Sequence, residues 1–292
     1  MERPAHSAPS RLTPGDPPPR RLLVGVGLGD GDAAVLEAAA RSCRDRGAVL
    51  AVSCLLATDD LLGPGGAIAE DLARRTAMVR ERVTAIVGAL PFDLVLDTGA
   101  AAPVLAMAAA LWSADRILVG ASSEPDGGAA IAEVARQAPC SVLVVRPGAV
   151  GDHIVVGTDL SSACRPALRA AADEQRWTGG ATTLVHSVEA QALGTPAAGI
   201  PRVTAAAPAG DPVEAELRQQ ADGAGLDATV RVMTGPVNDR LRELVVELSA
   251  GLLVLGATGA ARSDALLMGS TAETAVRSPP CSVLIARARH RR

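Results

Sequence analysis

Residues 237–256 read VNDRLRELVVELSAGLLVLG and place a helical pattern directly before a strand pattern. The apolar residues Val237, Leu241 and Leu244 recur at a spacing that puts them on one face of an α-helix. The continuous apolar run at 252–256 is typical of a strand that is covered on both sides. This unit predicts an α/β fold in which helices alternate with the strands of a mostly parallel sheet.

The chain contains the same succession of blocks twice. The runs that begin at Arg21, Val49, Asp93, Arg116 and Ala138 are matched, in the same order, by runs that begin at His153, Thr182, Thr229, Leu252 and Pro279. Such a repeat indicates a duplicated domain. We therefore predict two tandem, open, five-stranded, mostly parallel sheets with helices on both faces, in domains that span 20–147 and 152–288. Residues 1–19 are rich in proline, and we expect a disordered tail there.

Composition excludes several kinds of chemistry. Lysine and tyrosine are absent from the 292 residues, which removes a P-loop lysine, a Schiff-base lysine and a tyrosine acid or base. A net charge of −4 and 1% aromatic residues give no basis for nucleic-acid binding. No apolar run is long enough for a membrane span. The histidines are scattered, so no metal site is expected. The odd number of cysteines, without a CxxC pair, predicts reduced thiols in a cytoplasmic protein.

A glycine motif follows the fourth strand of the second copy. Two residues separate Gly256 from Gly259, and nine residues separate Gly259 from the run Gly269, Ser270 and Thr271. Glycines let backbone N–H groups approach an anion closely. A helix that begins at Ser270 adds unpaired N–H groups and a partial positive charge. The motif therefore predicts a phosphate site that needs no lysine.

Simpler explanations remain open for the residues around this motif. Ser270 and Glu273 have the spacing of a capping box, in which the serine would only cap its own helix. Arg262, between the glycines, either reaches a phosphate or stays a solvated surface residue. His186 lies in a predicted buried strand and is interpreted as a core histidine rather than a catalytic base. No catalytic residue is assigned.

The motif, the strand pattern and the duplication resemble the universal stress protein family in its tandem, UspA-like form. The resemblance covers residues 21–288 and implies a Rossmann-like fold of the adenine nucleotide alpha hydrolase type. It also implies that ATP, with Mg²⁺, binds in the second domain. The ATP-binding branch has an aspartate after the first strand, here Asp159, which follows Thr158. Its adenine contact falls at Ser187, where the family usually has a small aliphatic residue.

The resemblance and the motif together define a candidate binding set. Its members are Thr158, Asp159, Ser187, Gly256, Gly259, Arg262, Gly269, Ser270 and Thr271. For Asp159, capping of the next helix is an alternative role, and Ser161 and Ser162 are also suited to it.

The first copy lacks most of this set. Gly27 stands at the position of Asp159, and residues 128–130 (Gly-Ala-Ala) stand at that of the triplet that begins with Gly269. Asp32, where the first helix begins, would oppose a nearby phosphate. We therefore predict a degenerate first site and a single nucleotide site in the second copy.

The resemblance further implies a regulatory nucleotide sensor in the stress response, which passes its signal to a partner protein. It implies that the two domains pack as the subunits of a family dimer do, with Val142–Val145 and Val283–Ile285 as the seam, and that two chains can form a homodimer. Two other functions stay open: a slow ATPase or nucleotidyl-transferring enzyme, and a nucleotide-free interaction protein. Residues 190–212 are interpreted as a lid or as plain disorder.

Overall fold

The computed structural model describes residues 20–27, 31–56, 68–122, 127–148, 151–188, 212–258 and 268–288. The elements of the first half are β1 (Arg21–Val26), α1 (Asp32–Arg46), β2 (Val49–Leu56), α2 (Ile68–Val87), β3 (Phe92–Thr98), α3 (Ala101–Trp112), β4 (Arg116–Gly120), α4 (Gly127–Gln137) and β5 (Ser141–Val145). Those of the second half are β6 (His153–Gly157), the 3₁₀ turn η2 (Ser162–Cys164), α5 (Arg165–Thr178), β7 (Thr182–Val188), α6 (Pro212–Ala224), β8 (Thr229–Thr234), α7 (Val237–Glu247), β9 (Ala250–Gly256), α8 (Ser270–Arg277) and β10 (Ser282–Ala286). Both halves follow the predicted alternation of strands and helices.

Several sequence predictions fall outside the described residues. These are the tail at 1–19, Gly259 and Arg262 of the candidate site, and the lid segment up to residue 211. The last residue of that segment, Pro212, is the first residue of α6.

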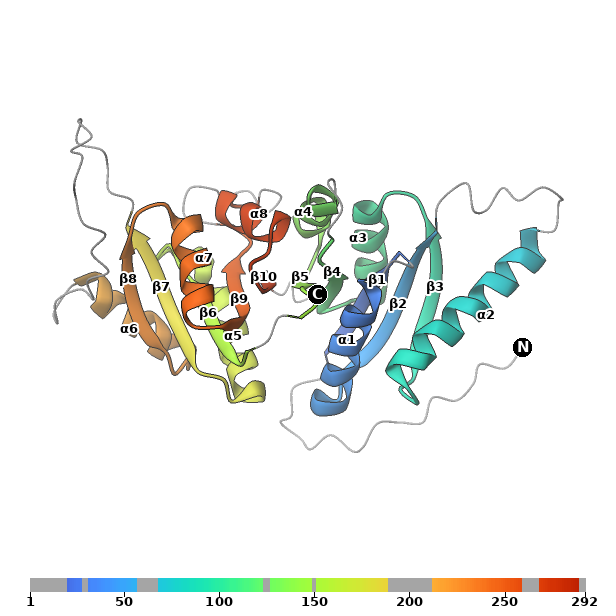
Figure 1. The fold of residues 1–292 in the computed structure, drawn as a ribbon, viewed down its shortest axis with the longest axis horizontal. Helices are drawn as coiled ribbons and strands as arrows, with labels where there is room; N and C mark the ends of the chain where they lie inside the picture. Colours follow the sequence, from blue (N-terminus) through green and yellow to red (C-terminus); the bar gives the residue numbers. More distant parts are fainter. Residues whose placement is uncertain are drawn as a thin grey trace.

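The ten strands of the described residues belong to one sheet, in the order β3-β2-β1-β4-β5-β10-β9-β6-β7-β8 (Figure 1). Neighbouring strands are parallel within each half. The halves meet where β5 runs antiparallel to β10, with Val144 opposite Val283 and Val142 opposite Ile285. The predicted seam is therefore confirmed, and it makes the two five-stranded sheets continuous.

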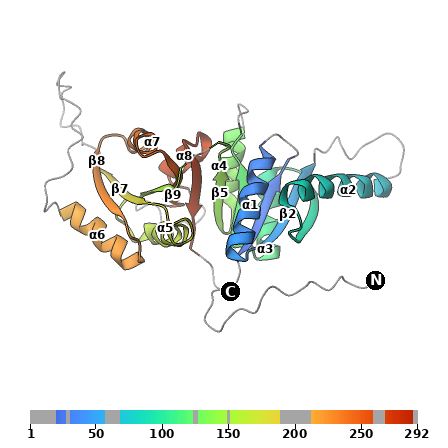
Figure 2. The ribbon, with the colours of Figure 1, turned by 60° about the horizontal axis from the view of Figure 1, so that its bottom comes forward.

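Helices cover both faces of this sheet. In Figure 1 the helices α7, α8, α4 and α3 follow one another along one face, and Figure 2 brings α6, α5, α1 and α2 forward on the other. One hydrophobic core lies under the first row and contains side chains from both halves, such as Ile131 and Val276. The opposite face has a separate core in each half, around Leu36 and Leu168 respectively. The halves therefore share buried apolar area on one face.

Two matched hydrogen bonds close the ends of the seam. The N–H of Arg146, directly after β5, donates to the hydroxyl oxygen of Ser282 at 3.2 Å. The N–H of Arg287, directly after β10, donates to the hydroxyl oxygen of Ser141 at 3.1 Å. Each half thus satisfies a backbone donor with a serine of the other.

A buried cluster of charges joins the halves on the opposite face. Glu174 of α5 is 5% exposed and accepts hydrogen bonds from three arginines of the first half. The shortest contacts to each guanidinium are 2.5 Å for Arg46, 2.8 Å for Arg116 and 3.3 Å for Arg20. Burial alone would raise the pKa of the Glu174 carboxyl, but Arg116 and Arg46 outweigh it and hold that pKa well below its usual range.

Gly128 allows α4 and α8 to approach closely at the interface. A Cβ added there would lie 2.3 Å from the carbonyl oxygen of Arg277 at the end of α8, which is far below any normal contact. This packing explains why a glycine is required at residue 128 without reference to an anion.

Gly128→Ala is expected to destabilise the protein by about 1–3 kcal/mol, because a backbone carbonyl cannot move aside as a flexible side chain would. Gly223→Ala is the matched control, since Gly223 lies in α6 and an added Cβ meets nothing within 4 Å. That change should stabilise the protein by about 0.5 kcal/mol through helix propensity. Urea unfolding of both variants tests the difference, and equal effects would contradict the packing argument.

Candidate functional site

The second half has its topological switch point between β6 and β9. From β6 the chain continues to β7 on one side, whereas β9 lies on the other side of β6. In open parallel sheets, ligands bind beyond the carboxyl ends of the strands at such a point. The candidate residues lie at these ends: Thr158 follows β6, Ser187 is near the end of β7, and Gly256 ends β9.

A tight turn follows β6. The N–H of Thr158 continues the strand pairing and donates to the carbonyl of Val185 at 3.0 Å, and the Thr158 side chain is buried. Asp159 is exposed, and Leu160 adopts a left-handed backbone conformation with φ of 65°. That conformation is costly for a leucine, so the turn must be held by its surroundings.

The Asp159 carboxylate forms part of this turn. Its Oδ1 atom accepts from the N–H of Ser161 at 2.9 Å and from the thiol of Cys164 at 3.0 Å. Burial, with a contribution from Asp159, raises the pKa of the Cys164 thiol to about 11, so the thiol keeps its proton at neutral pH. Ser161 caps η2 through the N–H of Ala163 at 3.3 Å. Asp159 therefore organises its own loop, while the cap of η2 is a serine.

Gln220 of α6 stabilises the same turn, and no pattern in the sequence predicts this role. Its amide nitrogen donates to the carbonyl of Leu160 at 2.8 Å, and its amide oxygen accepts from the hydroxyl of Thr158 at 3.2 Å. These two bonds join Thr158 and the left-handed residue Leu160 to a helix that lies about sixty positions further along the chain. A glutamine on an amphipathic helix has no pattern that distinguishes it from a solvated residue.

Both side chains near the end of β7, Ser187 and His186, contact backbone carbonyl groups of the protein. The hydroxyl of Ser187 donates to the carbonyl of Gly235, in the turn after β8, at 2.8 Å. The Nδ1 atom of His186 lies 2.9 Å from the carbonyl oxygen of Thr158. His186 is half-buried, and this contact engages one of its two ring nitrogens.

The N-terminus of helix α8 does not form the capping box that the Ser270–Glu273 spacing allows. The N-cap of the helix is Gly269, whose backbone is extended, with φ of −67° and ψ of 148°. Ser270 is therefore the first helical residue, and the alternative in which Ser270 caps the helix is wrong. Glu273 instead accepts from Arg277 at 2.8 Å and from Arg136 of the first half at 3.2 Å. Ser270 is exposed and Thr271 half-buried at the start of the helix, where the first N–H groups lack intrahelical partners.

Gly256 lies where β9 approaches the turn after β6. A Cβ built on it would lie 3.6 Å from the carbonyl oxygen of Ala163 and 3.8 Å from the Cα of Cys164. The carbonyl of the next residue, Ala257, accepts from the N–H of Gly269 at 2.9 Å. The structure thus connects the Asp159 turn, the end of β9 and the start of α8.

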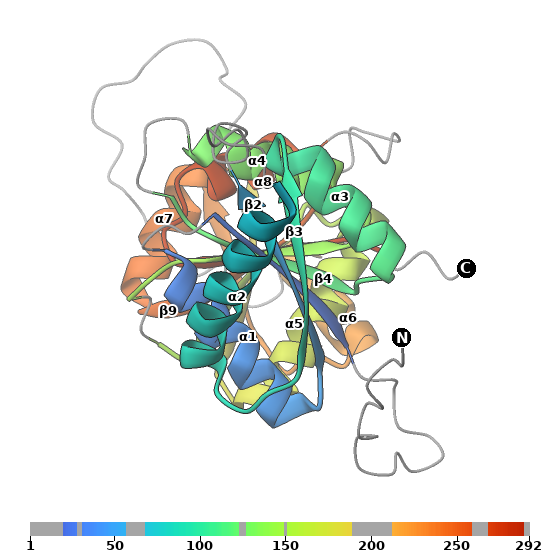
Figure 3. The same ribbon diagram turned by 90° about the vertical axis from the view of Figure 1, so that its right-hand side faces the viewer.

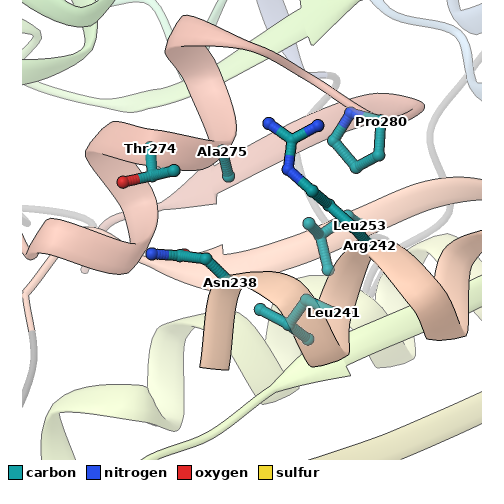
Figure 4. A pocket seen from close by; sticks show the side chains of 7 residues that line it. All are labelled: Asn238, Leu241, Arg242, Leu253, Thr274, Ala275 and Pro280. Atoms are coloured by element: carbon teal, nitrogen blue, oxygen red, sulfur yellow. The ribbon is translucent and has the colours of Figure 1, made fainter. Parts of the chain in front are cut away.

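A small pocket between α7, α8 and β9 is not this site. It is lined by Asn238, Leu241, Arg242, Leu253, Thr274, Ala275 and Pro280, and Figure 4 shows Asn238 and Thr274 at one end of it. Its volume of about 10 Å³ holds at most one water molecule. Within the described ranges, no three histidine, cysteine or acidic side chains gather in a way that would hold a metal ion.

The corresponding position in the first half is built differently. Gly27 takes the place of Asp159, and its N–H donates to the Asp32 carboxylate at 3.4 Å. Asp32 is the first residue of α1, as expected, so a negative charge occupies the start of the helix nearest to the strand end.

Comparison with known proteins gives a family match for both halves. The family model described as universal stress protein family matches residues 19–146 and 151–287. A universal stress protein structure from Archaeoglobus fulgidus is 17% identical, with a TM-score of 0.67 over 91% of this chain and 96% of that one. A putative universal stress protein structure from Pseudomonas aeruginosa is 14% identical, with a TM-score of 0.62 over 92% and 93%. No curated protein matches the chain in sequence.

Proposed function

The chain belongs to the universal stress protein family, and from this membership we propose that it is a regulatory nucleotide sensor that binds one ATP, with Mg²⁺, in its second domain. The observation that carries the proposal is the start of α8. There Gly269, Ser270 and Thr271 begin a helix connected through Ala257 to the end of β9, beside the switch point.

The start of α8 has the donors that a triphosphate needs. Its first N–H groups and the positive end of the helix dipole favour an anion, and the Ser270 and Thr271 hydroxyls add two further donors. The acidic Glu273 in the first turn is offset by ion pairs with Arg277 and Arg136. With no cluster of carboxylates among the described residues, Mg²⁺ would be bound mainly by phosphate oxygens and water.

The turn after β6 suits the other end of the nucleotide. We infer that Asp159 contacts the ribose or adenine, as the family resemblance implies. Cys164 and Gln220 hold that turn in place before any ligand arrives. The hydroxyl of Ser187 is directed to the carbonyl of Gly235, so Ser187 can pack against adenine like the small aliphatic residue that the family usually has there.

Other features of the chain bear on its location and on the role of its first domain. The five cysteines form no disulfide, which supports the proposed cytoplasmic location. None of the described helices is both long enough and apolar enough to cross a bilayer. We infer that the first domain, with Gly27 in place of Asp159, acts as a structural partner that binds no nucleotide.

Isothermal titration of the full chain with ATP and Mg²⁺ tests this function. We expect one ATP bound per chain and intact ATP after hours of incubation, because we assign no general base among the described residues of the site. Two equivalent sites would contradict the degenerate first domain. Steady release of ADP would indicate the slow ATPase instead, and the absence of binding would indicate the nucleotide-free interaction protein.

A further inference from the structure

Helices α4 and α8 pack against each other across the seam between the two domains, and both Figure 1 and Figure 3 show them next to each other. Gly128 at the start of α4 lies against the carbonyl of Arg277 at the end of α8. Arg136, in the last turn of α4, donates to the carboxylate of Glu273, in the first turn of α8, at 3.2 Å. The helices therefore run in opposite directions, and the end of α4 lies beside the start of α8.

The end of α4 is also bound to the carboxyl edge of the second domain's sheet. The guanidinium of Arg287, the residue after β10, donates to the carbonyl of Arg136 at 3.0 Å. The carbonyl of Ala286, which ends β10, accepts from the N–H of Ala257, directly after β9, at 3.1 Å. Ala257 in turn accepts from Gly269 at the start of α8. Arg136 of the first domain thus lies at the edge of the sheet that contains the candidate site.

The two copies differ at this contact. The sequence Pro-Cys-Ser-Val follows both helices, and counting back from it makes Arg136 the equivalent of Arg277. By the same count Glu273 is the equivalent of Ala132, which is buried and uncharged. The reverse contact cannot form, and Arg277 pairs with Glu273 of its own helix at 2.8 Å. Two equivalent arginines, one from each domain, thus converge on one carboxylate, which belongs to the copy that retains the glycine motif.

The charge of Glu273 would oppose a phosphate at the start of α8. Glu273 is four residues past Gly269, about 6 Å along the helix, which is within the roughly 8 Å over which physiological salt screens charges. Arg136 is shared between Glu273 and Glu133 of its own helix. The guanidinium groups of Arg136 and Arg277 therefore balance these two carboxylates. Loss of Arg136 would leave one net negative charge beside the first turn of α8.

We propose that Arg136 is a positioning residue of the nucleotide site, which the first domain supplies across the seam and whose charge sets the affinity of the second domain for the phosphates of ATP. This rests on the proposed function, since it takes the phosphates to bind at the start of α8. Arg136 acts through Glu273 and does not itself touch the ligand, because its guanidinium is bound to carboxylates. The first domain thereby takes part in binding, although we assign no nucleotide to its own site.

Titration calorimetry of the full chain with ATP tests the proposal. Arg136→Gln should weaken ATP binding about threefold to tenfold, because it leaves the charge of Glu273 incompletely balanced. The double variant Arg136→Gln/Glu273→Gln should bind ATP within about twofold of the wild type, because it restores the balance of charge. Adenosine, which has no phosphate, should bind equally to the wild type and both variants, whereas a disturbed structure would weaken both ligands.

Arg176→Gln is the matched control. Arg176 pairs with Asp173 near the end of α5 that leads to β7, at the opposite edge of the sheet from the candidate site. Its replacement removes the same charge and should leave ATP affinity unchanged. Thermal unfolding checks each variant. If Arg136→Gln fails to fold, Glu273→Gln alone provides the test, since it removes only the opposing charge and should tighten ATP binding about threefold.

The outcomes separate this proposal from the proposed function. A wild type that binds no ATP would overturn both. Three results would overturn the role of Arg136 alone while the wild type still binds ATP. They are unchanged ATP affinity in Arg136→Gln, a loss that Glu273→Gln does not recover, and an equal loss of adenosine binding. In the fallback experiment, ATP binding by Glu273→Gln that is no tighter than that of the wild type would also overturn it.

Discussion

Gly269→Asp is expected to weaken ATP binding at least about 100-fold, or about 2.8 kcal/mol, without destabilising the fold. Gly269 is the N-cap of α8, and its extended backbone conformation is open to any residue. Aspartate is a better N-cap than glycine by a few tenths of a kcal/mol, so the helix itself should gain. The new carboxylate would lie where the proposed phosphates bind, and two charges about 4 Å apart repel by several kcal/mol near a protein surface.

Gly269→Asn separates charge from size in this experiment. Asparagine caps helices about as well as aspartate and has nearly the same shape, but it is neutral. Titration calorimetry should therefore give a much smaller loss of affinity than for the aspartate. Equal losses would mean that bulk, not charge, excludes the ligand. Unchanged affinity in both variants would show that the phosphates do not bind at the start of α8.

Glu174→Gln is expected to lower the free energy of unfolding by about 3–5 kcal/mol. The substitution removes the carboxylate that Arg46 and Arg116 share and leaves their guanidinium groups around a buried neutral amide, while Arg20 keeps its second partner, Asp173. Urea or thermal unfolding measures the loss. Glu247→Gln is the matched control: its partner is Arg231, both side chains are exposed, and the expected cost is under about 1 kcal/mol.

The cost of Glu174→Gln should depend on pH. The pKa of Glu174 is lowered in the folded protein, so its contribution is present above the pKa of the unfolded chain, about 4.3, and declines as the pH falls toward the folded value. The wild type should therefore lose its advantage over the variant progressively below about pH 4.3. A difference independent of pH would mean that lost packing, rather than charge, causes the destabilisation.

The fold was largely predictable because apolar periodicity is a local signal. The apolar run at 252–256 that predicted a strand lies in β9, and the seam that the family resemblance implied is the pairing of β5 with β10. The start of α8 was only half predictable. The helix begins at Ser270 as expected, but the cap depends on the backbone angles of Gly269, which the Ser270–Glu273 spacing does not determine.

Contacts made only after folding had no local signal. The bonds from Gln220 to the turn after β6 join residues about sixty positions apart. The cluster at Glu174 brings together arginines from a loop end, a helix and a strand of the other half.

Helix α8 spans the short distance between the candidate site and the first domain. It has eight residues and is therefore about 12 Å long, too short to bend appreciably. One end presents Ser270 beside the switch point, and the carbonyl of Arg277 at the other end lies against Gly128 of the first domain. The two ends of one short helix therefore lie at the candidate site and at α4 of the first domain. The domain without Asp159 is thus in direct contact with the far end of the element to which we assign the phosphates.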